Sequence, residues 1–255
     1  MLIEERLEEI LKIVNEEGSI TVNKAANKLN VSIDTIRRDF IRLNNKGLVK
    51  RTHGGIVSKQ NTIYEYGAKK ETSSINNIEN KIKIAKMASS LISDGDTIIL
   101  DGGTTTYELS KCLNSFQELT LLTYGLNIAC ELSQNDSIST IIFGGIISNP
   151  AMAVLGPDAV EMIKHYRADK LFLAANAIDI EKGLMTPNRM QADIKKELIK
   201  IANEIIVVSD SSKFYKTALF SFCNFDVISK VVTDSRADSE FINSLKLKGI
   251  EVLLV

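Results

Sequence analysis

The stretch Asn30-Val-Ser-Ile-Asp-Thr-Ile-Arg-Arg-Asp-Phe40 joins a helix-capping residue to apolar residues at helical spacing. Ser32 is expected to cap a helix, because its hydroxyl oxygen can accept a hydrogen bond from a backbone N–H of the first turn. At about 100° per residue, Arg38 points away from the apolar stripe of this helix, and Thr35 and Arg42 lie beside it. The predicted stripe consists of Ile33, Ile36, Phe40 and Leu43.

The polar face of this helix has the composition of a DNA-recognition helix. Arginine can bind guanine edges or phosphates, and threonine can contact a base edge or a thymine methyl group in the major groove. Arg37 lies nearer to the apolar stripe, so we expect it to contact a phosphate or an aspartate of the chain itself. Many surface helices carry charges on one face, so the flanking sequence has to decide whether this helix recognises DNA.

Two amphipathic helices are predicted before the recognition helix. Gly18 ends the first, and Thr21 can cap the second. The short break at residues 30–31 then leads into the third helix, and two short helices joined by a tight turn form a helix-turn-helix. The inward positions are Ile3, Leu7, Ile10, Leu11 and Val14 in the first helix and Val22, Ala25, Ala26 and Leu29 in the second.

A small basic hairpin is predicted after the third helix. Residues 48–53 alternate loosely between apolar and polar types, Gly54-Gly55 supplies a turn, and residues 56–57 can return as a second strand. Such a hairpin is a wing. The side chains expected to contact phosphates or the minor groove are Lys50, Arg51 and His53.

Positive charge is concentrated in this part of the chain. Residues 21–58 contain eight lysines and arginines against two aspartates, a net charge of +6, whereas the whole protein has a net charge of −1. This distribution is typical of a surface that binds the DNA backbone.

Composition limits the class of protein. A length of 255 residues favours two domains, and no apolar run reaches the roughly 18 residues that a membrane-spanning helix needs. The chain begins with a charged amphipathic pattern rather than a signal peptide. Three widely spaced cysteines favour a reducing compartment, and only two histidines are present. We therefore expect a cytoplasmic protein that has no contact with a membrane and needs neither a metal ion nor an organic cofactor.

The predicted architecture is a winged helix-turn-helix over residues 1–58, a polar linker over 59–80 and an α/β domain over 81–255. In the last segment helices alternate with short apolar strands rich in β-branched residues. Strands of this kind are buried on both faces, which predicts a mostly parallel sheet covered by helices.

Polar residues follow several of these strands, at the end of the sheet where such folds bind their ligands. The stretch Asp101-Gly-Gly-Thr-Thr-Thr106 leads into a helix, so its backbone N–H groups and hydroxyls can hold an anion. Other strands end at Tyr124-Gly125, Gly144-Gly145 and Asp210-Ser-Ser-Lys213. A glycine-rich turn often only connects a strand to a helix, and the lysine that ends a Walker loop is missing here.

These motifs resemble those of DeoR-type bacterial transcriptional regulators. The resemblance rests on residues 32–39 and 49–55 and on the order of the strand-end motifs, and it covers nearly the whole chain. It implies a second domain similar to ribose-phosphate isomerases and CoA transferases, and regulation by a phosphorylated sugar. The chain departs from the family pattern at Thr123-Tyr-Gly125, at Ala177 and at Asp193, which leaves the identity of the effector open.

The hypothesis that follows is a repressor of a carbohydrate-metabolism operon, relieved by a phosphorylated sugar, that binds double-stranded DNA as a homodimer or homotetramer. Thr104, Thr105 and Thr106 are expected to hold the phosphate with Lys213, and Asp101 to accept hydrogen bonds from sugar hydroxyls. The polyol end is expected to meet Tyr124, Asn176, Lys195 and Asp210. Backbone approach is expected at Gly102, Gly103, Gly125, Gly144 and Gly145.

Two alternatives remain open at this point. One is an isomerase-like enzyme that uses Asp101, Asp193 or Asp210 as a base, although no motif pairs two carboxylates beside a lysine. The other is a DNA-binding activator whose second domain only oligomerises.

Overall fold

A computed structural model describes residues 3–17, 19–52, 54–58 and 74–255. The chain forms two compact units, residues 1–70 and residues 71–255. His53 and residues 59–73 of the predicted linker lie outside the described residues, as does the side chain of Lys50. In the described part of the chain, no helix is both long and apolar enough to cross a membrane.

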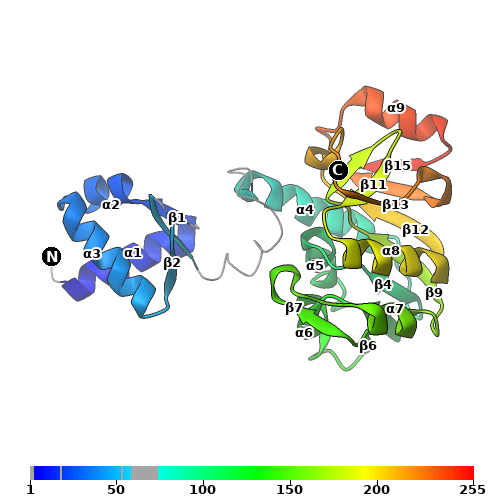
Figure 1. Cartoon of the computed structure of the whole chain (residues 1–255), viewed down its shortest axis with the longest axis horizontal. Coiled ribbons are helices and arrows are strands. Elements are labelled where there is room, and N and C mark those ends of the chain that lie inside the picture. The colour runs from blue at the N-terminus through cyan, green and yellow to red at the C-terminus, as the bar shows by residue number, and fades with distance from the viewer. Residues whose placement is uncertain (1–2, 18, 53, 59–73) are drawn as a thin grey trace. The chain divides into compact units, whose positions relative to one another are not determined.

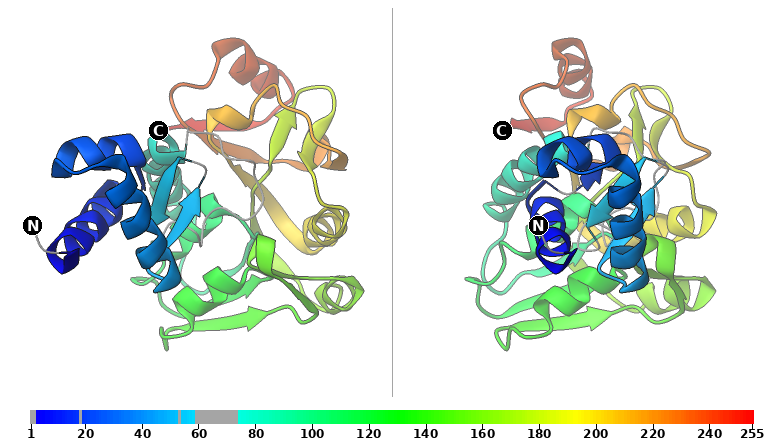
Figure 2. Two further views of the ribbon diagram at one scale, coloured as in Figure 1. Left: turned by 60° about the vertical axis from the view of Figure 1, so that its left-hand side comes forward. Right: turned by 90° about the vertical axis from the view of Figure 1, so that its left-hand side faces the viewer.

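The first unit is a three-helix bundle with a small sheet, as the sequence predicts. Ser32 and Thr21 cap α3 and α2, because their hydroxyl oxygens accept hydrogen bonds from the backbone N–H groups of Thr35 and Lys24. Helix α3 lies against the β2–β3 hairpin (Figure 2). The elements are α1 (Ile3–Glu17), β1 (Ser19–Thr21), α2 (Val22–Leu29), α3 (Ile33–Asn45), β2 (Val49–Thr52) and β3 (Gly55–Ser58).

The core of this unit follows most of the predicted stripes and corrects two positions. Ile36, Phe40 and Leu43 of α3 are buried, but Ile33 is 44% exposed and Ile3 of α1 is 47% exposed. Both exposed residues lie in the first turn of their helix, where the helix has not yet reached the core. Three buried residues of these two helices were not predicted, Arg6 and Ile13 of α1 and Asp39 of α3.

The strand β1 was not predicted. It pairs antiparallel with β3, so the unit contains a three-stranded sheet in the order β1-β3-β2. The sequence predicted that Gly55 belongs to the turn, but in the structure Gly55 begins β3. A Cβ atom at this position would lie 2.2 Å from the carbonyl oxygen of Ile20, so glycine is required for the two strands to approach.

The second unit is built on a seven-stranded parallel sheet in the order β15-β14-β12-β9-β4-β5-β6. Its strands are short and apolar, as predicted. In chain order they are β4 (Thr97–Leu100), β5 (Leu119–Thr123), β6 (Ile138–Ile142), β9 (Ala168–Leu173), β12 (Ala202–Val208), β14 (Lys230–Thr233) and β15 (Glu251–Leu254).

Helices cover both faces of this sheet, as the parallel arrangement requires (Figure 1). Alternate residues of β4 serve the two layers: Ile98 and Leu100 pack with one set of helices, and Ile99 packs with the other. The first layer consists of α4 (Ser74–Ser89), α5 (Thr104–Ser110) and α6 (Leu126–Leu132). The second consists of α7 (Pro157–Ile163), α8 (Arg189–Ile201) and α9 (Ser239–Leu247).

The structure adds elements that the pattern did not reveal. Helix α4 begins at Ser74, inside the segment assigned to the linker. Two further small sheets are antiparallel, a β7–β8 hairpin and a sheet in the order β10-β11-β13. Their strands are too short to show a period: β7 (Ile146–Ser148), β8 (Ala153–Leu155), β10 (Ala177–Asp179), β11 (Gly183–Thr186) and β13 (Phe220–Cys223).

Candidate DNA-binding and effector sites

The outer face of α3 carries accessible cations. Arg38 and Arg42 are exposed, and the side chain of Arg38 forms no ion pair or hydrogen bond within the described ranges. The Nη1 of Arg37 donates to Asp34 at 3.2 Å, which is the contact within the chain that its flank position predicted. The Thr35 hydroxyl lies 2.8 Å from that of Ser32, so it remains near the start of the helix.

A polar hollow of about 250 Å³ lies beside this face. It is lined by the start of α2, at Thr21 and Asn23, by Arg37 of α3 and by Arg51 of the wing. A helix start with two guanidinium groups matches the charge and donors that a DNA phosphate requires. Asn44 of α3 fixes the wing strand, because its Oδ1 accepts a hydrogen bond from the backbone N–H of Arg51 at 3.1 Å.

An ion pair in the core holds α3 against α1. The Nε of Arg6 donates to the Oδ2 of Asp39 at 2.5 Å, and both side chains are almost completely buried. The hydrogen bond to Asp39 raises the pKa of Arg6, so the guanidinium stays charged. Arg42 also approaches the second Asp39 oxygen at 3.6 Å, which leaves part of its charge engaged within the chain.

In the second unit, the order of strands defines where a ligand crevice lies. From β4 the chain builds the sheet outward in one direction through β5 and β6, and then in the other through β9 and β12. Connections after β4 and β9 therefore diverge to opposite faces, and parallel sheets bind ligands at such a switch point. Asp101–Thr106 follows β4 and residues 174–176 follow β9, so the predicted effector residues start from the expected place.

Beneath these strand ends lies a buried polar cluster around Asp101, which is 0% exposed. One carboxylate oxygen accepts hydrogen bonds from Lys195 of α8 and from the backbone N–H of Ala174, the latter at 2.8 Å. The other oxygen accepts from the Tyr124 hydroxyl at 2.5 Å. Lys195, 3% exposed, also donates to the carbonyl oxygen of Ala174 at 2.9 Å.

This cluster corrects three predicted roles. Burial and the negative charge of Asp101 raise the pKa of Tyr124 well above its ordinary value. The hydroxyl therefore stays protonated and donates a hydrogen bond to the carboxylate. Asp101, Tyr124 and Lys195 satisfy one another and are closed to solvent. They brace the strand ends from beneath instead of presenting polar groups to a sugar.

Several residues of the turn at 102–106 also make contacts within the protein. A Cβ atom on Gly102 would lie 2.8 Å from the ring of Tyr124, and one on Gly103 would lie 3.0 Å from the Cβ of Ala174. These glycines therefore make room for the cluster. The buried Thr106 hydroxyl donates to backbone carbonyls, including that of Asp101 at 2.5 Å, so it is removed from the predicted phosphate cradle. Thr105 is buried and Thr104 is partly accessible.

Lys81 of α4 is a cation near the predicted effector residues Asp210 and Lys213, and it was not predicted from the sequence. Burial lowers its pKa, Asp210 and Glu108 raise it in part, and Lys213 lowers it further, with a net decrease. Lys81 and Lys213 therefore lie close enough to repel each other. Neither side chain forms an ion pair or hydrogen bond in the part of the chain that the structure describes. Lys81 lies at the boundary between the predicted linker and the α/β domain, and no motif of the sequence includes it.

The remaining predicted residues divide by accessibility. Asp210 is buried and caps the short helix η3 (Ser211–Lys213), accepting a hydrogen bond from the backbone N–H of Ser212 at 3.1 Å. Asn176 is exposed beside β10. Gly125 is buried against Ile128.

Gly144 and Gly145 follow β6, the edge strand of the large sheet, and not one of the strands at the switch point. Gly145 has a φ of +144°, and a Cβ atom there would lie 2.7 Å from the carbonyl oxygen of Leu155. Glycine at this position therefore lets the chain that enters β7 pass close to the end of β8, and the turn between the two strands lies at Asn149–Ala151.

The carboxylates considered for an enzyme do not meet. Asp101 is sealed, Asp210 is occupied by η3, and Asp193 pairs with Arg189 on the outer surface of α8 at 3.1 Å. Asp193 also lines a groove of about 900 Å³ between α7 and α8, in which none of the predicted effector residues lies. The residues predicted to bind the effector therefore lie outside this groove.

In residues 3–17, 19–52, 54–58 and 74–255, no group of three histidine, cysteine or acidic side chains is arranged to hold a metal ion.

Burial raises the pKa of the Cys223 thiol to about 12, which favours its protonated, unreactive form.

Comparisons with known proteins identify a family for both units of the chain. Residues 6–62 match the family model of the DeoR-like helix-turn-helix domain, and residues 76–235 match that of the DeoR C terminal sensor domain. The regulator GolR of Listeria innocua serovar 6a is 32% identical over 248 residues, covering 97% of each chain. The transcriptional repressor GlcR of Bacillus subtilis (strain 168) is 30% identical over 256 residues, covering 100% of this chain and 97% of GlcR.

A ribose 5-phosphate isomerase A from Methanocaldococcus jannaschii is similar in structure, with a TM-score of 0.41 and 20% sequence identity. The match covers 55% of this chain and 56% of the isomerase.

Proposed function

Because the chain belongs to the DeoR family of transcriptional regulators, we propose that it represses a carbohydrate-metabolism operon and that a phosphorylated sugar relieves the repression. Residues 1–58 bind the operator, and the second unit, in which α4 begins at Ser74, binds the effector. The sensor-domain match and a relative that is itself named a repressor support this division.

The observation that carries the effector proposal is the pair of unpaired lysines at the strand ends. Lys81 is partly buried near Asp210, whose charge raises the pKa of Lys81, and near Lys213, whose charge lowers it. Thr104 offers a hydroxyl at the start of α5. A phosphate dianion placed between the two ammonium groups replaces repulsion with attraction and accepts charge-assisted hydrogen bonds. Asn176 is accessible for the hydroxyl groups of the sugar.

The DNA half of the proposal rests on α3 and the wing. Arg38 and Thr35 read base edges, and Arg37, Arg51, Lys50 and His53 hold phosphates. One recognition helix covers a short site, so the regulator acts in the cytoplasm as a homodimer or homotetramer on repeated half-sites.

Titration of DNA binding with candidate effectors tests the proposal. The full-length protein is incubated with DNA from upstream of its own gene, and its affinity is measured with and without a panel of hexose, pentose and triose phosphates. At least one sugar phosphate should weaken binding by roughly 5- to 150-fold, the usual range of allosteric coupling. The matching unphosphorylated sugars should have no effect.

A thermal-shift measurement distinguishes a second unit that binds an effector from one that only oligomerises. A ligand that binds only the native state raises the melting temperature, so the effective sugar phosphate should stabilise the protein without DNA. If no compound of the panel changes either the melting temperature or DNA affinity, the second unit is not a sugar-phosphate sensor. Tighter DNA binding with the effector would instead indicate activation or co-repression.

A further inference from the structure

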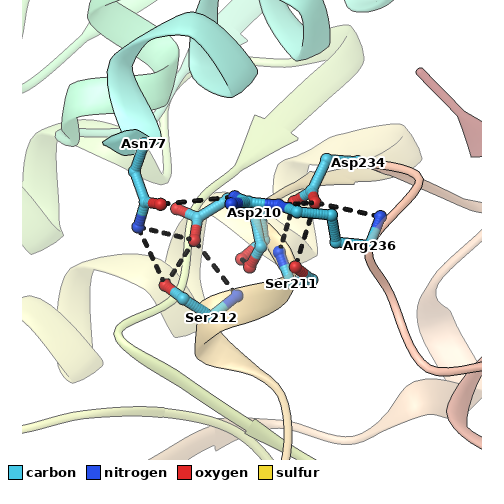
Figure 3. A network of polar contacts seen from close by, with 7 residues as sticks. Asn77, Asp210, Ser211, Ser212, Asp234 and Arg236 are labelled. Carbon is cyan, nitrogen blue, oxygen red and sulfur yellow. Dashed lines mark hydrogen bonds and ion pairs between the residues drawn. The ribbon is translucent and has the colours of Figure 1, made fainter. Parts of the chain in front are cut away.

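Asn77, near the start of α4, joins three segments that are distant in the sequence. Its Nδ2 donates to the Oδ1 of Asp210 and to the Oγ of Ser212, both at 3.4 Å, in the loop that follows β12. Its amide oxygen accepts a hydrogen bond from the Nη2 of Arg236 at 3.3 Å, in the loop that follows β14. Figure 3 shows the contacts of Asn77 with residues of both loops as dashed lines.

Asp234 closes the network on the other side. It is buried, and its carboxylate accepts hydrogen bonds from the backbone N–H of Ser211 at 2.7 Å, the Ser211 hydroxyl at 3.0 Å and the Nε of Arg236 at 3.1 Å (Figure 3). Burial raises the pKa of Asp234, but the hydrogen bonds from Ser211 and Arg236 outweigh burial and leave the pKa below its ordinary value. The carboxylate is therefore charged at neutral pH and anchors Arg236.

The same two elements carry the lysines of the effector site. Asn77 and Lys81 are four residues apart in α4 and so lie on the same face of the helix. Asp210 caps η3, and Lys213 ends it. An anion bound by both Lys81 and Lys213 would draw α4 and η3 together. Asn77 already joins these two elements through its hydrogen bonds to Asp210 and Ser212.

We propose that Asn77 and Arg236 form a clasp that couples occupancy of the effector site to the start of α4. The inference rests on the proposed effector role of Lys81 and Lys213. Hydrogen bonds of 3.3–3.4 Å are longer than the roughly 2.7–3.2 Å that is usual for N–H···O contacts, so a small movement of η3 tightens them. Helix α4 follows the predicted linker in the chain, so its first turns are the described part of the second unit that lies nearest in sequence to the winged-helix unit.

Two variants test the clasp in the full-length protein. Asn77→Ala removes all three hydrogen bonds of the amide, and Arg236→Ala removes the opposite partner while Asp234 keeps its bonds to Ser211. Three quantities are measured: operator affinity alone, affinity for the most effective sugar phosphate of the panel by calorimetry, and operator affinity at saturating effector.

In both variants the first two affinities should stay within about threefold of wild type, while the ratio of operator affinities without and with effector should fall below about threefold. The double variant should lose no more coupling than either single variant, because both changes open the same clasp. Lys83→Ala, an exposed change on the same helix, is the matched control and should keep the wild-type ratio.

Hydrogen exchange supplies a second measurement. The effector should slow amide exchange in residues 77–81 of the wild type and of Lys83→Ala, but not of Asn77→Ala. Wild-type coupling in both clasp variants would overturn the inference. A variant that loses effector affinity more than about tenfold, with its coupling ratio intact, would also overturn it by making Asn77 a ligand contact. If the wild type itself does not respond to any sugar phosphate, the proposed function fails first.

Discussion

Lys81 lies partly buried on α4, where the net effect of its surroundings lowers its pKa from the ordinary value of 10.5. Burial is the main cause, and the charge of Lys213 adds to it. A bound phosphate favours the protonated form. Affinity for a sugar phosphate should therefore decrease as the pH rises through the lowered pKa of Lys81, while exposed lysines are still charged.

Substitution at Lys81 tests this role. Lys81→Met should weaken effector binding by about ten- to a hundredfold, since a charged hydrogen bond contributes about 1.5–3 kcal/mol. Lys81→Arg should keep binding and lose the decrease at high pH, because arginine does not deprotonate in proteins. Calorimetry between pH 7 and 10 measures both effects.

Lys83→Met on the same helix is the control and should behave as wild type. Unchanged affinity in Lys81→Met would place the phosphate elsewhere in the crevice.

Asp101 illustrates how a residue's surroundings decide its role. A carboxylate at a strand end has the chemistry to bind a sugar, and the sequence predicted that use. Tyr124, Lys195 and Ala174 already occupy its two oxygens, and they leave none of it exposed. A buried charge is tolerated only when it is paired in this way.

At the scale of elements, the position of α3 depends on one buried ion pair. Arg6 and Asp39 join α1 to α3 across the core of the first unit. Removal of one partner leaves the other charge buried and unpaired, which is more costly than loss of an exposed pair.

Asp39→Ala should therefore destabilise the winged-helix unit by about 3–5 kcal/mol. Asp34→Ala on the same helix removes the exposed pair with Arg37 and should cost less than about 1 kcal/mol. Denaturant unfolding followed by circular dichroism measures both, with operator binding as a second readout. Equal stability of the two variants would show that the buried pair does not hold α3.

Helix α4 belongs to two parts of the molecule at once. Its apolar face packs on the large sheet, and its polar face brings Asn77 and Lys81 to the strand ends. The sequence predicted its later turns but assigned its first turns to the linker, because the residues around Ser74–Asn80 are polar and lack a clear period.

At the scale of the whole molecule, the chain must act as more than one copy if each copy reads a short site. Footprinting should reveal two half-sites whose centres are about 10–10.5 base pairs apart, or a multiple of this spacing. Sedimentation at the concentration used for binding should detect a dimer or tetramer. A monomer that protects a single half-site with full affinity would contradict this assembly.

The sequence by itself determined the winged helix, its caps and the parallel α/β class. Ser32, Thr21 and the apolar periods act through neighbours a few residues away, so they are visible along the chain. It also indicated the strand ends as the place for a ligand, because all strands of a parallel sheet present their carboxyl ends at one edge.

Only the tertiary structure decided which strand-end residues are accessible. Lys195 reaches Asp101 across 94 positions of sequence, and Asn77 reaches Asp210 across 133. Burial and pKa depend on the groups that packing brings around a side chain, and local sequence does not contain them. Lys195 therefore pairs with Asp101 in the interior, and Lys81 supplies a cation of the proposed effector site.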